Sequence, residues 1–135
     1  MGNKVIRVLM IEPKQYPKIS HIGSSLQDLR VAVSIGADEI GNVKSKKIGN
    51  GVYVIFNEDG FFAGLEANRR IDREIISGVF YVIATDENYH PVSLSEDQIL
   101  KYMTRFLTPE KIPLAEIVDC HLDRLFESID ENEQC

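Results

Sequence analysis

Three short runs of apolar, β-branched and aromatic residues most constrain how this chain can fold. They are VIRVLMI at residues 5–11, VYVIF at 52–56 and GVFYVIA at 78–84. Runs of this length and composition are typical of buried strands. Asn50-Gly51, directly before the second run, is a strong hairpin signal, and NEDG at 57–60 is a second turn signal. The three runs therefore predict the centre of a sheet.

The segments between these runs are predicted with weaker signals. Pro13 and Pro17 predict an extended loop over residues 14–20, because proline restricts the backbone and lacks a donor. The other expectations are a short strand at 39–43, a polar turn at 44–51, brief strand character at Phe61-Phe62 and a loop at 66–70 (EANRR).

Three helices are predicted from capping residues and apolar spacing. Ser24 with Gln27 fits a capping box, followed by Leu26, Leu29 and Val33 at helical spacing up to Gly36. Ser95 with Gln98 fits a second box, and the apolar stripe of that helix comprises Ile99, Leu100, Met103, Phe106 and Leu107. After Pro113, an acidic amphipathic helix is expected from Leu114 to Ile129.

The order of these elements predicts an α+β domain. We expect a mostly antiparallel sheet of about four to five strands with two to three helices packed on it. Residues 1–112 are expected to form the core domain. Residues 113–135 are expected to form the acidic helix and tail, which would pack on the core or at a dimer interface.

Charge and cysteine content exclude several classes of protein. The net charge is −6, and residues 108–135 carry eight acidic against two basic residues, so direct nucleic-acid binding is not expected. No apolar run approaches the roughly 20 residues that span a bilayer, so no membrane segment is expected. Cys120 and Cys135 form no disulfide framework, which predicts a cytoplasmic location. We find no metal-ligand spacing and no cofactor fingerprint, so we expect neither.

Three stretches together resemble a known family: RVLMIEP at 7–13, SLQDLRVAV at 25–33 and NEDGFFAGLEANR at 57–69. The strand ISGVFYV at 76–82 fits the same ordered pattern. The set resembles the bacterial domain of unknown function 3846, with the likeness covering about residues 5–107. The resemblance implies short proteins carried by phages, plasmids and conjugative elements. It brings no activity, cofactor or catalytic residue.

The candidate binding residues are Asn68, Arg69, Arg70, Arg73 and Glu12. Arginine's planar fork suits a phosphate or carboxylate, so EANRR and its neighbours could form an anion site. Alternatively, Asn68 caps a turn while Arg69 or Arg70 pairs with Glu66, Asp72 or Glu74. We expect Asn68 to shape the loop and one arginine to brace it against the sheet, which leaves the other free to bind. Glu12 ends a buried strand beside a proline, but no catalytic partner is evident for it.

Two functions of different classes remain open. The first is a non-enzymatic accessory protein of a mobile element, with a role such as counter-defence. It would bind a host or phage macromolecule, most simply a protein, and could form a homodimer through the helix at 114–129. The second is a small-ligand binder that sequesters a phosphorylated or nucleotide-like molecule through residues 66–73. An enzyme ranks third, because we find no nucleophile–base pair in the sequence.

Overall fold

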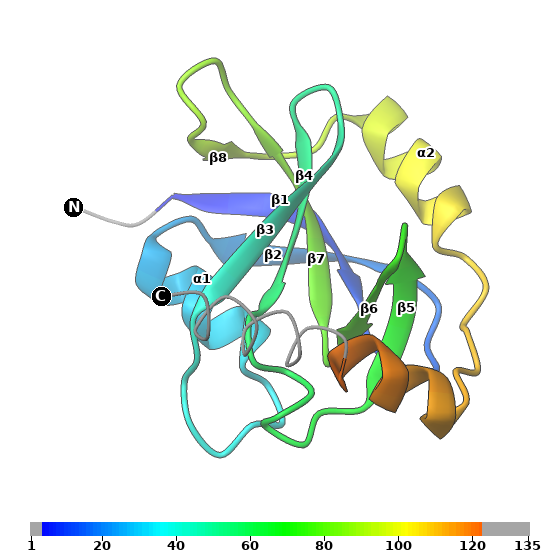
Figure 1. Ribbon diagram of the computed structural model, residues 1–135. Coiled ribbons are helices and arrows are strands. Elements are labelled where there is room, and N and C mark those ends of the chain that lie inside the picture. Colours follow the sequence, from blue (N-terminus) through cyan, green and yellow to red (C-terminus); the bar gives the residue numbers. More distant parts are fainter. Residues whose placement is uncertain (1–3, 123–135) are drawn as a thin grey trace, which may run out of the picture.

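The computed structural model describes residues 4–122 and contains an antiparallel sheet with helices on both of its faces (Figure 1). The elements are β1 (Val5–Ile11), β2 (Lys18–Gly23), α1 (Leu26–Val33), β3 (Val43–Gly49), β4 (Val52–Asn57), β5 (Ala67–Ile71), β6 (Glu74–Ser77), β7 (Phe80–Thr85), β8 (Pro91–Val92) and α2 (Glu96–Arg105). A third helix covers residues 114–122. None of these helices is long and apolar enough to cross a membrane.

The main sheet has the strand order β2-β1-β7-β4-β3, and the short β8 pairs with the end of β7. β5 and β6 form a separate two-stranded hairpin, and every ladder in the described residues is antiparallel. The three predicted apolar runs are β1, β4 and β7, which lie side by side in the middle of the sheet. The predicted α+β class with a mostly antiparallel sheet is therefore confirmed.

Apolar side chains leave the sheet on both faces because successive residues of a strand point in opposite directions. On one face, α2 and the β5–β6 hairpin cover a cluster that includes Leu9, Val54 and Phe80. On the other face, α1 covers a smaller cluster that includes Val8, Ile55 and Tyr81. The central strands are therefore buried on both sides, which explains why they read as nearly continuous apolar runs.

The helix starts follow capping chemistry. The box at Ser95 is confirmed, because the Ser95 hydroxyl accepts from the Gln98 amide and the Gln98 side chain accepts from the Ser95 amide. At α1 the predicted cap at Ser24 is wrong by one residue. Ser25 is the N-cap, and its hydroxyl accepts from the amide of Asp28 at 3.1 Å.

Several weaker predictions are wrong, mostly at the sheet edges. The loop predicted at 14–20 overlaps β2, which begins at Lys18, and most of the turn predicted at 44–51 belongs to β3. Both are edge strands of the sheet, where polar side chains are tolerated and no apolar alternation is required. The short strand at 39–43 is absent, and Phe61-Phe62 lies in a turn. EANRR is mainly strand, since β5 begins at Ala67.

The described part of the C-terminal helix packs beside the β5–β6 hairpin. Its His121 is buried and stacks on Phe61, with ring centroids 4.1 Å apart. The Cys120 thiol lies 3.9 Å from the carbonyl oxygen of Arg73. Three apolar side chains of the helix stay exposed: Leu114, Val118 and Leu122. Dimerisation through residues 114–129 stays a prediction, and residues 123–129 lie outside the described part of the chain.

Candidate functional site

Asn68 is completely buried and joins three parts of the fold. Its side-chain amide nitrogen donates to the carbonyl oxygen of Ile11 at 2.8 Å and to that of Gly78 at 2.9 Å. The ladder between β5 and β6 shifts register between Ala67 and Arg69, so Asn68 occupies a bulge. A bulge redirects side chains, and here it turns a polar side chain into the protein. Asn68 therefore ties β5 to the ends of β1 and β6.

Arg69 is also inside the protein, with 1% of its surface exposed. Its guanidinium donates to Asn68 Oδ1 at 2.7 Å, to the Gln15 carbonyl at 2.7 Å and to the Phe106 carbonyl at 3.0 Å. Burial lowers the pKa of Arg69, and the charge of Glu110 opposes this shift. One arginine therefore braces this part of the fold, although its backbone acceptors lie in the loop after β1 and at the end of α2 rather than in the sheet. We call Asn68 and Arg69 the buried clamp.

Arg70 points outward but is already engaged. Its guanidinium lies 3.1 Å from a Glu110 carboxylate oxygen and also pairs with Glu116. The expectation that the second arginine is free is therefore wrong, and its partners are Glu110 and Glu116 rather than the acids nearby in sequence. Arg73 is exposed, and its side chain has no ion pair within residues 4–122. Glu66, the first residue of EANRR, pairs with Lys14, and the Lys14 ammonium lies 2.7 Å from a carboxylate oxygen of Glu66.

Glu12, at the end of β1, is half-buried and accepts from the Lys18 ammonium at 2.8 Å. A carboxylate paired with lysine in this way is typical of a local ion pair. Glu12 also influences Tyr81, a buried residue of β7 whose hydroxyl donates to the Ala32 carbonyl at 3.0 Å. Burial, with a smaller contribution from the charge of Glu12, raises the pKa of Tyr81 to about 12.

The raised pKa of Tyr81 predicts a loss of stability in alkali. Because the folded protein holds this proton more tightly than the unfolded chain, Tyr81's contribution is complete below its unfolded pKa of about 10 and is lost as the pH rises towards about 12. We expect the free energy of unfolding to fall over this window. This decrease in the free energy of unfolding should be smaller in Tyr81→Phe. In Tyr16→Phe, which changes an exposed tyrosine and serves as the control, the decrease should match that of the wild type. Urea unfolding at several pH values measures this, and equal slopes for Tyr81→Phe and wild type would contradict it.

The histidines and Cys120 do not gather into a metal site. Within residues 4–122, no group of three or more His, Cys, Asp or Glu side chains is placed to hold a metal ion. His90 lies 3.5 Å from Asp86, and His121 stacks on Phe61. Cys135 lies outside the described residues.

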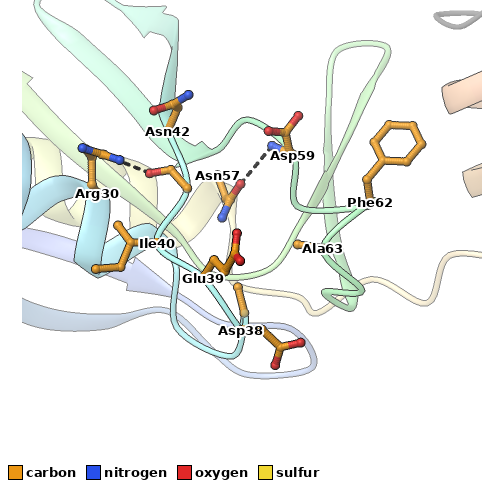
Figure 2. A pocket seen from close by; sticks show the side chains of 11 residues that line it. Arg30, Asp38, Glu39, Ile40, Asn42, Asn57, Asp59, Phe62 and Ala63 are labelled. Atoms are coloured by element: carbon orange, nitrogen blue, oxygen red, sulfur yellow. Dashed lines mark hydrogen bonds between the residues drawn. The ribbon is translucent and has the colours of Figure 1, made fainter.

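A hollow of about 520 Å³ lies between the loop after α1 and the turn after β4 (Figure 2). We call it the acidic hollow, because three carboxylates and a single guanidinium line it. It has an apolar rim, in which Phe62 is 63% exposed and Ile40 is also exposed. Its lining comprises Arg30, residues 37–42, Asn57, Asp59, Phe62 and Ala63.

The loop that forms one wall of the acidic hollow is fixed by hydrogen bonds. The buried Ser34 hydroxyl donates to the Arg30 carbonyl at 2.7 Å and accepts from the Gly41 amide at 2.9 Å. The Arg30 guanidinium donates to the Gly41 carbonyl at 3.1 Å (Figure 2). The loop therefore returns to the end of α1, and the wall of the hollow is organised before any ligand binds.

Ser34→Ala tests this fixation of the loop. It removes one donor and one acceptor from a buried position, so we expect a loss of about 1–3 kcal/mol in the free energy of unfolding. We also expect faster hydrogen exchange at the Gly41 amide. Ser93→Ala, in which an exposed hydroxyl loses one bond to the Arg7 amide, is the control and should cost less. Unchanged exchange at Gly41 in Ser34→Ala would show that the hydroxyl does not hold the loop.

The residues of the acidic hollow were not among the sequence-predicted candidates. Asp38, Glu39 and Asp59 lie in two separate polar segments, ADE at 37–39 and NEDG at 57–60. Such segments are typical of solvated turns, so neither signals a site alone. The two segments could have been recognised as one site only from a predicted contact between the loop after α1 and the turn after β4.

Comparison with known proteins identifies the family of the chain. The model of the family described as "Domain of unknown function (DUF3846)" matches residues 6–107. Neither the curated proteins nor the solved structures include one that matches the chain. The matched region runs from β1 through α2 and so includes both the buried clamp and the acidic hollow. The chain belongs to the DUF3846 family.

Proposed function

We propose that this protein is a non-enzymatic accessory protein that acts by binding another protein through the acidic hollow. The setting proposed for it is a phage or other mobile element in the cytoplasm of a bacterial host, with counter-defence as one role it could serve. The resemblance to short proteins of such elements supports this setting by association. The choice of binding surface rests on the geometry of the hollow.

The acidic hollow is the observation that carries the proposal. It combines net negative charge with exposed apolar side chains, notably Phe62, in a concave surface. Protein interfaces join aromatic anchors to a polar rim, and complementary charge accelerates the encounter of two partners. The net charge of −6 on the whole chain adds to the attraction for a basic protein.

The alternative, a phosphorylated small ligand held by residues 66–73, is less well supported by the geometry. A phosphate needs donors that are accessible and uncommitted. The guanidinium of Arg69 is buried and donates to three oxygens of the protein itself. That of Arg70 faces two glutamates, which would repel an anion. Arg73 alone is a weak basis for a site.

A photo-crosslinking amino acid in place of Phe62 tests the proposed function. The variant would be expressed in the bacterium that carries this chain, and crosslinked products would be identified by mass spectrometry. We expect one discrete protein partner. The same replacement at Tyr16, an aromatic side chain that is also exposed, is the matched control and should yield none. Identical products from both positions, or none from Phe62, would contradict the proposal.

A further inference from the structure

We propose that the acidic hollow takes an arginine side chain from an exposed segment of the partner protein. This inference rests on the proposed function and specifies the chemistry that the hollow recognises. Asp38, Glu39 and Asp59 oppose the single cation of Arg30, which leaves an excess of two negative charges in the lining. Within residues 4–122, none of these three carboxylates forms an ion pair. Their charges are therefore available to an incoming cation.

Asn57 adds an uncommitted hydrogen-bond donor to the hollow. Its side chain is buried, at 4% exposure, and lines the hollow. Its Oδ1 accepts from the Asp59 amide at 2.9 Å, which leaves the Nδ2 donor directed into the hollow (Figure 2). Within the described residues Nδ2 has no hydrogen-bond partner. The nitrogen itself is reached by solvent from the hollow, so it is available to a ligand that carries an acceptor.

An arginine within a peptide meets both requirements. Its guanidinium presents five donors in a plane and can bridge more than one carboxylate, whereas lysine offers a point charge. A backbone carbonyl of the same segment can accept from Asn57 Nδ2. The flat guanidinium can also lie against the exposed ring of Phe62. A bare metal ion fits less well, because it brings no acceptor for Nδ2.

The lack of a side chain at Gly41 leaves room for the Asn57 amide. A Cβ added at Gly41 would lie 2.8 Å from Asn57 Nδ2 and 2.9 Å from its Oδ1, closer than real contacts allow. Gly41→Ala should therefore displace the amide without changing any charge. This substitution separates the contribution of the amide from that of the carboxylates.

The test uses a defined probe, the peptide acetyl-Gly-Leu-Arg-Leu-Gly-amide, and a matched peptide in which citrulline replaces arginine. Citrulline keeps the shape of the side chain and removes its charge. Titration into the isotope-labelled full chain should shift the NMR signals of Gly41, Phe62 and the Asn57 side-chain amide. We expect the citrulline peptide to bind about 10-fold more weakly or worse, because charge-assisted hydrogen bonds are lost.

Variants locate the binding on the acidic hollow. Glu39→Gln and Asp59→Asn change exposed carboxylates and should each weaken binding roughly 3- to 10-fold. Gly41→Ala should weaken it as well. Glu87→Gln, an exposed acid in the turn after β7, is the control and should leave binding unchanged.

Three results would overturn the inference: no binding at millimolar peptide, equal binding of the citrulline peptide, or binding that the variants leave unchanged. The proposed function is tested apart from it. If a partner is still crosslinked at Phe62 in the double variant E39Q/D59N, the proposed protein-binding function is supported and the proposed recognition of an arginine is refuted. If no partner is crosslinked at Phe62, the proposed protein-binding function itself is refuted.

Discussion

Arg69→Ala is expected to cost about 3–5 kcal/mol in the free energy of unfolding. The substitution removes a fully buried side chain and leaves three acceptors, Asn68 Oδ1 and the carbonyls of Gln15 and Phe106, without their donor. Because small domains are stable by only about 5–15 kcal/mol, the variant should unfold at markedly lower urea concentration. Equilibrium urea unfolding with circular dichroism measures the difference.

Two further variants show whether the shape of the guanidinium or its charge matters. Arg69→Lys keeps the charge, but a single ammonium cannot reach three acceptors in the same fork geometry, so it should remain strongly destabilising. Arg73→Ala removes an exposed arginine four residues along and should stay within about 0.5 kcal/mol of the wild type. Equal stability of Arg69→Ala and Arg73→Ala would contradict the structural role of the buried clamp.

Asn68→Leu is expected to cost about 2–5 kcal/mol, slightly less than the loss of Arg69. The substitution keeps the branching and the number of heavy atoms of the side chain but removes both donors, so the carbonyls of Ile11 and Gly78 lose this partner in the interior. Each such loss costs about 1–3 kcal/mol. Asn88→Leu, at an exposed turn position, is the matched control and should be close to neutral in urea unfolding.

Asn68 and Arg69 should also be coupled, because they share a hydrogen bond of 2.7 Å. A double-mutant cycle with Asn68→Leu and Arg69→Ala should give a coupling free energy of about 1–3 kcal/mol. Strict additivity of the two single effects would mean that the residues act separately.

The centre of the fold could be predicted from the sequence, whereas its edges could not. β1, β4 and β7 are buried on both faces, so their composition alone marks them as strands. β2 and β3 lie at the edges, where one side of the strand needs no partner and polar residues are tolerated. Their sequences, KISHIG and VKSKKIG, therefore resemble loops.

The candidate residues show the same division. That one arginine of EANRR has a structural role could be predicted, because charged residues in such a segment are usually solvated or paired locally. That Arg69 lies in the interior could not, since charged residues are rarely buried and the bulge at Asn68 depends on pairing with β6. The acceptors of Arg69 lie 54 and 37 residues away along the chain, at Gln15 and Phe106. Local sequence carries no signal for contacts at that separation.

The acidic hollow was missed for a related reason. Its carboxylates come from two turns, and the fold alone brings them to one surface. The hydroxyl of Ser34, which holds one of those turns, follows directly after α1, where serine reads as an ordinary helix end. Sites assembled from turns in this way become visible only when the register of the strands between them is known.

Native mass spectrometry of the protein, purified gently from the cells that naturally produce it, tests the central proposal most directly. We expect an intact complex with a second protein, and we expect Glu39→Gln with Asp59→Asn to reduce its abundance relative to the Glu87→Gln control. A small bound mass that is released on denaturation, and is lost with Arg70→Ala or Arg73→Ala rather than with the acidic variants, would contradict the proposal. That result would place function at the β5–β6 hairpin as a ligand site.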